Sequence, residues 1–262
     1  MDILSKIISK KIDELNQLKR SISISDLESS EFFERNNKSI VNGLIENEIS
    51  IIAEHKRKSP SKSEINSQTP TEKIINGYQE AGAAALSILT EKNFFNGSTN
   101  DILNARKITE LPILRKDFII DEFQIFESRF IGADCILLIV ACLNDTELND
   151  FYNISKSLKM DALIEVHNED ELQRALKLKP KMIGINNRNL KNMTVALDTS
   201  IKLVKKIPNN ILVVSESGFK NHSDLKLMEH YGIKSFLIGE TFMKSKNIQS
   251  SVENILFGRN NA

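Results

Sequence analysis

Lysine and glutamate side chains stand at the ends of short apolar runs in this sequence, where a strand could hold each of them. Glu54 and Lys56 end one such run, and Lys116 ends another. Glu165 lies inside the stretch ALIEV, where a buried acid needs a partner or an unusual proton affinity. If the fold brings these groups together, mutual proximity and burial drive their pKa values apart. Such a set suits general acid and general base catalysis.

Small and polar residues end the later apolar runs and predict an anion site. Glycine and serine at these places would let backbone N–H groups approach a phosphate. Ser59, beyond Lys56, could donate a further hydrogen bond. For any single position the alternative is a solvated surface residue, but the pattern recurs at run after run. The residues of the anion site are Ser217, Gly218, Gly239 and Glu240, at the ends of the last two runs, whereas Asn186, Arg188 and Glu216 are further polar residues at run ends.

Eight short apolar runs, spaced roughly 20 to 35 residues apart, are the elements that would position these groups. Segments between them have acidic starts, basic ends and helical spacing of apolar residues. Apolar strands that alternate with helices indicate a parallel sheet covered on both faces. The runs are residues 49–54, 83–89, 111–116, 135–140, 161–166, 182–186, 211–217 and 235–239.

Eight strand–helix units predict an α/β fold of the closed (β/α)8 TIM-barrel type, in which the active site lies at the carboxyl ends of the strands. The length of 262 residues fits such a barrel. The alternative is an open doubly wound sheet. That fold usually has a glycine-rich loop after its first strand, whereas EHKRKSPSK contains no glycine.

The first part of the chain is predicted to form helices that precede the barrel. One apolar stripe at helical spacing includes Leu4 and Ile7, and SDLE, starting at Ser25, is a capping box for a second helix that would carry Phe32 and Phe33. We therefore expect an N-terminal helical extension, residues 1–48, packed on a catalytic barrel, residues 49–262. The opening segment lacks the features of a signal peptide, and no stretch has the apolar length of a membrane span.

The composition limits the expected partners. Lysine plus arginine and aspartate plus glutamate are equal at 35 each, so there is no global attraction to nucleic acid or an anionic membrane. The basic run HKRKSPSK could contact nucleic acid, but it follows an apolar strand. We expect a small phosphorylated ligand, with neither nucleic acid nor membrane as a partner. Cys135 and Cys142 are too few for a zinc site or a disulfide framework, and are expected to be buried thiols in a reducing cytoplasm.

A series of motifs resembles the indole-3-glycerol phosphate synthase family, in order from about residue 49 to the C-terminus. They are IIAEHKRKSPS, LSILTEKNFFNGS, PILRKDFIID, ADCILLIV, ALIEVHNEDEL, IGINNRNL, VSESG and FLIGETFM. The resemblance implies conversion of 1-(2-carboxyphenylamino)-1-deoxyribulose 5-phosphate to indole-3-glycerol phosphate in tryptophan biosynthesis, with loss of carbon dioxide and water. It implies no metal and no organic cofactor. For the oligomeric state we expect a monomer, with a homodimer as the alternative.

The resemblance also implies catalytic roles. Lys116 matches the general acid that helps the carbonyl accept the ring carbon, and Glu165 matches the general base. Lys56 would bind the substrate carboxylate and share in proton transfer, while Glu54 would orient and charge-balance the lysines. The residues matched to assisting roles are Asn186, Glu216 and Ser217, beside the reacting portion, and Arg188, which would position the substrate.

Binding positions follow from the same resemblance. An anionic substrate with a carboxylate and a phosphate needs cations and N–H groups at opposite ends of its cleft, and an apolar wall between them excludes water. The phosphate would lie on Ser59, Gly218, Gly239 and Glu240, mostly through backbone N–H groups, and the aromatic ring would lie against Phe95, Phe118, Leu137 and Leu237.

Two positions depart from the family pattern. His55 stands where a tyrosine is frequent, although its parity along the strand points it away from the barrel interior. Lys62 stands where glycine is common, which bears on the conformation of the first loop.

Two other enzymes remain as alternatives. A Schiff-base aldolase also uses a lysine at a strand end, and phosphoribosylanthranilate isomerase shares the phosphate end without needing two lysines and Glu165.

Overall fold

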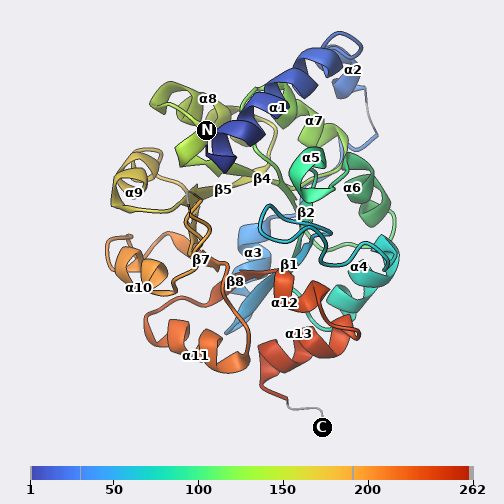
Figure 1. Ribbon diagram of the computed structural model, residues 1–262. Helices are drawn as coiled ribbons and strands as arrows, with labels where there is room; N and C mark the ends of the chain where they lie inside the picture. The colour runs from blue at the N-terminus through green and yellow to red at the C-terminus, as the bar shows by residue number, and fades with distance from the viewer. Residues whose placement is uncertain (1, 30, 191, 260–262) are drawn as a thin grey trace.

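Eight parallel strands close into a barrel in the computed structural model, which describes residues 2–29, 31–190 and 192–259. Each strand pairs with the next along the chain, and β8 returns to β1, so the predicted (β/α)8 fold is confirmed. Figure 1 looks onto the barrel, with the strands at the centre and the helices around them. The strands are β1 (Ser50–His55), β2 (Ala85–Leu89), β3 (Ile113–Lys116), β4 (Cys135–Ile139), β5 (Asp161–Val166), β6 (Met182–Asn186), β7 (Leu212–Glu216) and β8 (Ser235–Ile238).

Helices follow the strands and cover the outside of the barrel. Several begin with an Asn or Ser side chain that accepts a hydrogen bond from a first-turn N–H, as Asn221 does from Asp224. In the described ranges, no helix has the length and apolar character needed to cross a membrane. The helices are α4 (Thr71–Glu80), α5 (Lys92–Phe95), α6 (Thr99–Arg106), α7 (Phe123–Phe130), η1 (Val140–Cys142, 3-10), α8 (Asp145–Ser157), α9 (Glu169–Leu176), α10 (Asp198–Val204), α11 (His222–His230), α12 (Glu240–Met243) and α13 (Ile248–Phe257).

Side chains alternate along each strand between the barrel interior and the surrounding helices. In β1, Ile52 packs with Leu114 and Leu163 inside the barrel, whereas Ile51 and Ala53 pack outward with helix residues. The same alternation turns Glu54 inward. Because of this alternation, charged side chains at the carboxyl ends of different strands point into the same end of the barrel.

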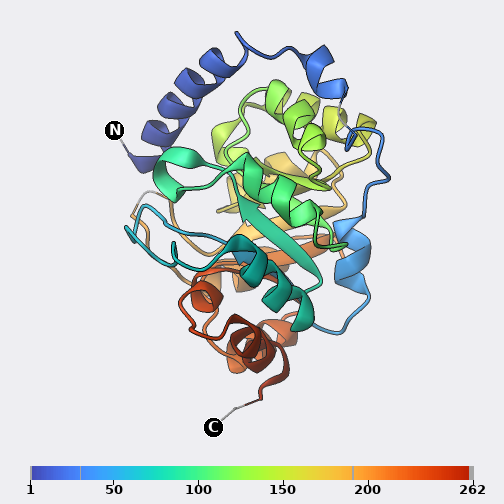
Figure 2. The same ribbon diagram turned by 90° about the vertical axis from the view of Figure 1, so that its right-hand side faces the viewer.

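The N-terminal extension reaches both ends of the barrel. It consists of α1 (Ile3–Leu18), α2 (Ile24–Glu28) and α3 (Ile40–Ile45). Figure 2 shows α1 beside the end where the loop after β1 lies, and α3 at the opposite end. Ile7 of α1 and Leu44 of α3 both join the cluster that fills the barrel interior. The extension thus covers the barrel at top and bottom, and a domain boundary at residues 48–49 stays a prediction.

Two details of the extension differ from the sequence-based expectation. The capping box is formed by Ser23 and Asp26 rather than starting at Ser25. The helix ends at Glu28, so Phe32 and Phe33 lie in the turn that follows it. Ser23 accepts from the Asp26 N–H and Asp26 accepts from the Ser23 N–H, and this reciprocal pair fixes the start of the helix at Ile24, before Ser25.

The cysteines are free, but only one of them is buried. Cys135 lies inside the barrel, fully buried. Cys142, at the end of η1, is partly exposed, so the expectation of burial was wrong for this residue. Its position on the rim after β4, rather than in the strand, accounts for the exposure.

His55 is buried on the outer side of β1 and makes no hydrogen bond through its ring. It is 1% exposed, and both ring nitrogens lack partners. Burial, reinforced by the Arg57 guanidinium, lowers the pKa of His55 from 6.5 to about 4. The folded protein therefore binds fewer protons here than the unfolded chain. The stability that the neutral ring contributes is complete above about pH 6.5 and is lost as pH falls toward 4, by up to about 3 kcal/mol.

We predict that His55→Phe makes the fold less sensitive to acid. The difference in free energy of unfolding between the variant and the parent should grow in favour of the variant as pH falls from 7 to 4.5, because phenylalanine takes up no proton. Urea denaturation at a series of pH values measures this difference. His230→Phe, at an exposed position on α11, is the matched control. A difference that stays constant with pH would show that His55 does not titrate as its burial requires.

Candidate active site

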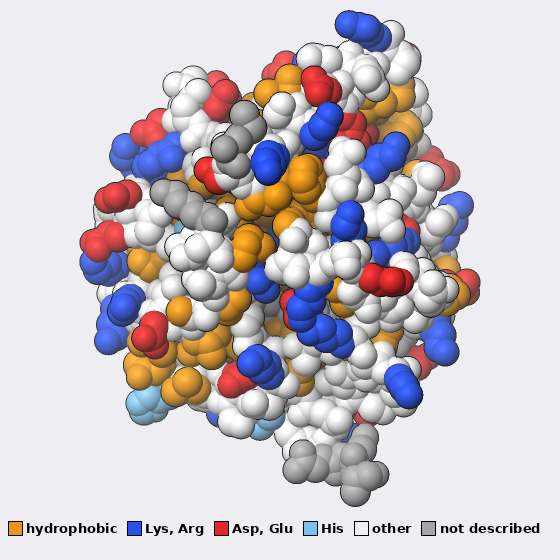
Figure 3. Space-filling model, in the orientation of Figure 1, with side chains coloured by type: hydrophobic (Ala, Val, Ile, Leu, Met, Phe, Trp, Pro, Cys, Tyr) orange, Lys and Arg blue, Asp and Glu red, His pale blue; other side chains and the backbone are white. Residues whose placement is uncertain are grey.

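A cavity of about 580 Å³ opens at the carboxyl ends of the strands. Figure 3 shows hydrophobic side chains gathered at the centre of this face, with Lys and Arg side chains beside them. Every predicted site residue except Gly239 lines this cavity. The sequence therefore located the cavity correctly, and Gly239 lies just behind its wall, against Glu54.

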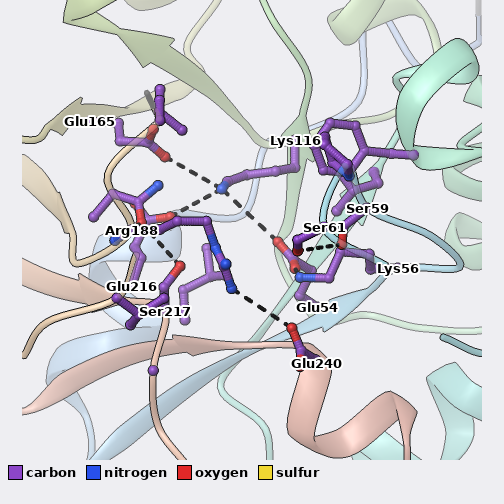
Figure 4. Close-up of a pocket in the computed structure, with 18 of the residues that line it drawn as sticks. Glu54, Lys56, Ser59, Ser61, Lys116, Glu165, Arg188, Glu216, Ser217 and Glu240 are labelled. Carbon is purple, nitrogen blue, oxygen red and sulfur yellow. Dashed lines mark hydrogen bonds and ion pairs between the residues drawn. The ribbon is translucent and has the colours of Figure 1, made fainter. Parts of the chain in front are cut away.

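Lys116 is the central group of the cavity. Its Nζ lies 3.0 Å from Glu216 Oε2, 3.4 Å from Glu165 Oε2 and 4.0 Å from Glu54 Oε2. The three carboxylates come from β7, β5 and β1, so the closed barrel is what brings them to one ammonium group. Figure 4 shows Lys116 reaching between them. One cation surrounded by three buried acids is an arrangement that strongly perturbs proton affinity.

The shared cation separates the proton affinities of these groups. Although burial opposes it, the carboxylates of Glu216, Glu165 and Glu54 raise the pKa of Lys116 above its usual range. Burial also opposes ionisation of Glu165, but Lys116 and His167 hold its pKa below the usual range. Burial, with repulsion from Glu165, raises the pKa of Glu216 to about 8. The free site thus contains a protonated lysine, an ionised Glu165 and a Glu216 that binds a proton near neutral pH.

Lys56 and Glu54 form a second ion pair on the β1 side of the cavity. Lys56 Nζ donates to Glu54 Oε1 at 2.6 Å. Although burial opposes it, Lys56 and then Lys116 lower the pKa of Glu54, so its carboxylate bridges the two lysines. A Cβ on Gly239 would lie 2.6 Å from Glu54 Oε1. Gly239 therefore makes room for the carboxylate that holds both lysines.

Gly184 makes room for Glu216 in the same way. A Cβ on Gly184 would lie 2.3 Å from Glu216 Oε1 and 3.2 Å from a methyl group of Leu163.

We predict that Gly184→Ala lowers the free energy of unfolding by about 1–3 kcal/mol through overpacking, and lowers kcat because Glu216 is displaced from Lys116. Urea denaturation and steady-state rates measure both effects. Gly77→Ala in α4 is the matched control, because its Cβ would meet Ile248 and Gln249 at 3.5–3.6 Å; a parent-like Gly184→Ala would contradict the prediction.

Asn186, Ser217 and Arg188 form a hydrogen-bonded group across the ends of β6 and β7. Ser217 Oγ donates to Asn186 Oδ1 at 3.0 Å, and the Arg188 N–H donates to the same oxygen at 3.0 Å. Ser217 and Gly218 both have positive φ, at 69° and 100°. A positive φ favours glycine, as at Gly218, and both residues line the cavity.

The predicted phosphate end is richer in side-chain charge than expected. Glu240 was assigned through its backbone, but its carboxylate bonds to Lys62 and Lys244, and Arg188 Nη2 lies 3.7 Å away. Although burial opposes it, Lys244 and Lys62 lower the pKa of Glu240 to about 2. Lys62, one of the two departures from the family pattern, thus ties the first loop to α12.

An apolar wall faces these charged groups. The rings of Phe95 and Phe118 lie 6.1 Å apart between centroids, and Leu137 and Leu237 complete the predicted wall. The sequence missed the contribution of α1, which adds Ile3, Leu4 and Ile7 to the lining. The apolar stripe of that helix was visible in the sequence, but nothing in the spacing tells which surface the stripe covers.

Comparisons with known proteins agree with the geometry. A family profile described as indole-3-glycerol phosphate synthase matches residues 4–255. Proteins of that name are similar to this chain in Acetivibrio thermocellus, with 49% identity over 78% of this chain and 79% of the relative, and in Thermoanaerobacter pseudethanolicus, with 43% identity over 92% of both chains. The protein of that name in Legionella pneumophila has 40% identity over 97% of this chain and 98% of the relative.

Solved structures support the barrel. Thiamine phosphate pyrophosphorylase from Pyrococcus furiosus has a TM-score of 0.61 at 15% identity, covering 81% of this chain and 96% of its own. The 3-hexulose-6-phosphate synthase from Salmonella typhimurium has a TM-score of 0.62 at 12% identity, covering 79% and 96%. At such identities the likeness concerns the fold alone, whereas the profile and the relatives identify the family. The chain belongs to the indole-3-glycerol phosphate synthase family, the carboxy-lyases of tryptophan biosynthesis.

Proposed function

We propose that the Lys116 cluster carries the family's reaction, the closure of the indole ring of 1-(2-carboxyphenylamino)-1-deoxyribulose 5-phosphate. The observation that carries this proposal is one buried ammonium within 4.0 Å of three carboxylates, at the floor of a cavity with an apolar wall. Ring closure needs a proton delivered to the carbonyl oxygen, and loss of water needs one delivered to the leaving hydroxyl and one removed from the methylene carbon beside the nitrogen; when carbon dioxide leaves, its bonding electrons return to the aromatic ring. Positioned lysine and glutamate side chains supply both operations.

Lys116 acts as the general acid and Glu165 as the general base. Lys116 is protonated in the free site, so it can donate to the carbonyl oxygen while the ring carbon attacks the carbonyl carbon. Glu165 is ionised and lies 3.4 Å from the same ammonium group, so it can take the proton that the methylene carbon beside the nitrogen loses when water leaves. The two groups have opposite charges before the reaction, and their proton affinities favour this division of roles.

Lys56 holds the substrate carboxylate until it leaves as carbon dioxide, and shares in proton transfer at the hydroxyl that leaves as water. Glu54 orients both lysines, since its two oxygens face Lys56 and Lys116. Asn186 and Ser217 hydrogen-bond the reacting portion from the opposite side. Glu216, which binds a proton near neutral pH, can donate as well as accept there.

The phosphate lies at the end of the cavity formed by the first loop and the ends of β7 and β8. Ser59 and the N–H groups of Gly218, Gly239 and Glu240 are the proposed donors, and Arg188 positions the chain between phosphate and ring. Lys62 offsets the charge of the Glu240 carboxylate, which would otherwise repel the phosphate.

We predict that Ser59→Ala raises KM by at least about tenfold, the scale of a hydrogen bond to a charged group, with a smaller change in kcat. The same variant should leave the already poor use of a dephosphorylated substrate analogue unchanged, because no phosphate is then present. Steady-state rates with both compounds measure this. An equal loss with both compounds would show that Ser59 acts on the fold of the loop and not on the phosphate.

Neither alternative enzyme accounts for the cluster equally well. A Schiff-base aldolase needs a lysine that readily loses its proton, whereas the carboxylates raise the pKa of Lys116. Borohydride trapping of a lysine adduct would support the aldolase and count against the proposal. The isomerase reaction does not need two lysines and Glu165, so it does not explain why Lys56, Lys116 and Glu165 lie together. We further propose a cytoplasmic monomer that acts without metal or organic cofactor; activity after EDTA treatment and dialysis, and sedimentation at working concentration, test these points.

A further inference from the structure

We propose that His167 and Glu171 form a positioning pair behind Glu165, in which a charged imidazole orients the base and keeps it ionised. The inference rests on the proposed role of Glu165. His167 follows β5 directly, and Glu171 lies in the first turn of α9. His167 has the strand parity of Glu165, yet no role in the reaction is assigned to it above.

The imidazole lies between two carboxylates. Its Nδ1 makes a hydrogen bond with Glu171 Oε2 at 3.0 Å, whereas its Nε2 lies 3.3 Å from Glu165 Oε1 as a charge contact without hydrogen-bond geometry. A carboxylate oxygen in such a pair accepts hydrogen bonds, so each ring nitrogen faces an acceptor. The Nδ1 bond needs a hydrogen on Nδ1, and the approach of Nε2 to the Glu165 carboxylate is favourable when the ring is charged, so the two carboxylates together favour the imidazolium.

Glu171 is held so that it can orient this ring. The His167 N–H donates to Glu171 Oε2 at 2.8 Å, and Asn168 Nδ2 donates to Glu171 Oε1 at 2.6 Å. The Glu171 N–H in turn donates to Asn168 Oδ1 at 3.0 Å. The carboxylate is therefore fixed by the start of α9, and it fixes the ring.

The His167 ring and the Lys116 ammonium group contact different oxygens of the Glu165 carboxylate. Lys116 meets Oε2 at 3.4 Å, whereas His167 meets Oε1. Lys116 gives up a proton in the proposed reaction. His167 is not among the residues that line the substrate cavity; it lines a neighbouring cavity of about 340 Å³, on the far side of Asn186 and Arg188, which line both. His167 can thus keep its charge on Glu165 while the charge of Lys116 changes.

The other titratable groups around the His167 ring do not remove its positive charge. Asp2, at the start of α1, and Arg188, after β6, line the same second cavity and bring opposite charges to its outer side. Cys142, after β4, stays a neutral thiol, because burial and the two carboxylates raise its pKa. Although burial opposes it, Glu165 and Glu171 raise the pKa of His167 to about 10. The imidazolium therefore persists through neutral pH.

The test is the titration of His167 compared with the pH dependence of kcat in the full-length protein and in Glu171→Gln. In the parent, ring nitrogen NMR signals, assigned by their loss in His167→Gln, should show imidazolium at pH 8. Removal of the Glu171 charge lowers the pKa of His167, so Glu171→Gln should lose activity as pH rises through the new value. The midpoint of that loss should equal the NMR midpoint, with KM nearly unchanged.

Two further variants separate position from charge. His167→Leu should lower kcat about tenfold at pH 7, the scale of losing a contact to a charged group. His167→Gln, which keeps a donor without the charge, should recover part of that loss. A neutral His167 in the parent at pH 8 would overturn the inference, as would an NMR midpoint that moves in Glu171→Gln while the kcat profile stays still. Failure of the proposed function itself would look different, with charged His167 in the parent but parent-like activity in Glu165→Gln.

Discussion

Lys116→Met is expected to lower kcat by at least about a hundredfold, the usual scale for a positioned acid. Methionine keeps the length and packing of the side chain but removes the proton that Lys116 donates. It also removes the cation that Glu54, Glu165 and Glu216 share. We expect the buried carboxyls to bind protons in its place, so Glu165 becomes a poorer base as well. Single-turnover and steady-state rates with purified variant measure the loss.

Lys226→Met is the matched control for that experiment. Lys226 lies on α11 and pairs only with Glu229 among the contacts described for it, so its loss should leave kcat unchanged. Lys116→Arg adds a second comparison, because it keeps the charge but holds its proton more tightly and cannot act as an acid. If Lys116→Met turned over substrate at nearly the parent rate, Lys116 would have no part in the chemistry.

Glu165→Gln should be impaired on the same scale in kcat while it still binds substrate. The amide has the shape of the carboxylate and can still accept from Lys116 or His167, but it cannot take the proton from the methylene carbon beside the nitrogen. Substrate binding, measured by titration under conditions without turnover, should change only slightly because the phosphate and carboxylate ends are untouched. The split between kcat and binding is the specific mark of a lost base.

Glu169→Gln, at an exposed position in the first turn of α9, controls for the loss of an acid near this part of the barrel. Its kcat should match that of the parent. If Glu165→Gln instead lost binding with kcat preserved at saturation, Glu165 would serve to hold Lys116 in place, and another group would have to remove the proton.

The barrel and most of its mouth could be predicted because both follow from short-range patterns. Strand parity alone turned Glu54, Lys116 and Glu165 to the same side as their strands' interior residues, and closure of the sheet then brought them together. The family resemblance supplied the catalytic roles of the residues. The alternation of side chains along each strand and the spacing of the runs supplied their positions in the barrel. Strand parity and the spacing of the runs are local features of the sequence, so they can be read without knowing which distant segments meet.

Features that depend on contacts between distant segments were out of reach. Nothing in α1 indicates that Ile3 and Leu4 cover the mouth, because an amphipathic helix specifies that one face is buried but not against what. Gly184 and Gly239 were read as strand and phosphate residues, although each leaves space for a carboxylate on a neighbouring strand. The Lys62–Glu240 pair likewise joins residues far apart in sequence.

The most direct measurement is indole fluorescence after 1-(2-carboxyphenylamino)-1-deoxyribulose 5-phosphate is added to the parent protein, Lys116→Met and Glu165→Gln in EDTA. The chain has no tryptophan, so its own signal is low. We expect a steady rise with the parent and a rise slower by about a hundredfold or more with either variant. A flat signal from folded parent protein, or equal rates in all three, would contradict the assignment of the chemistry to Lys116 and Glu165.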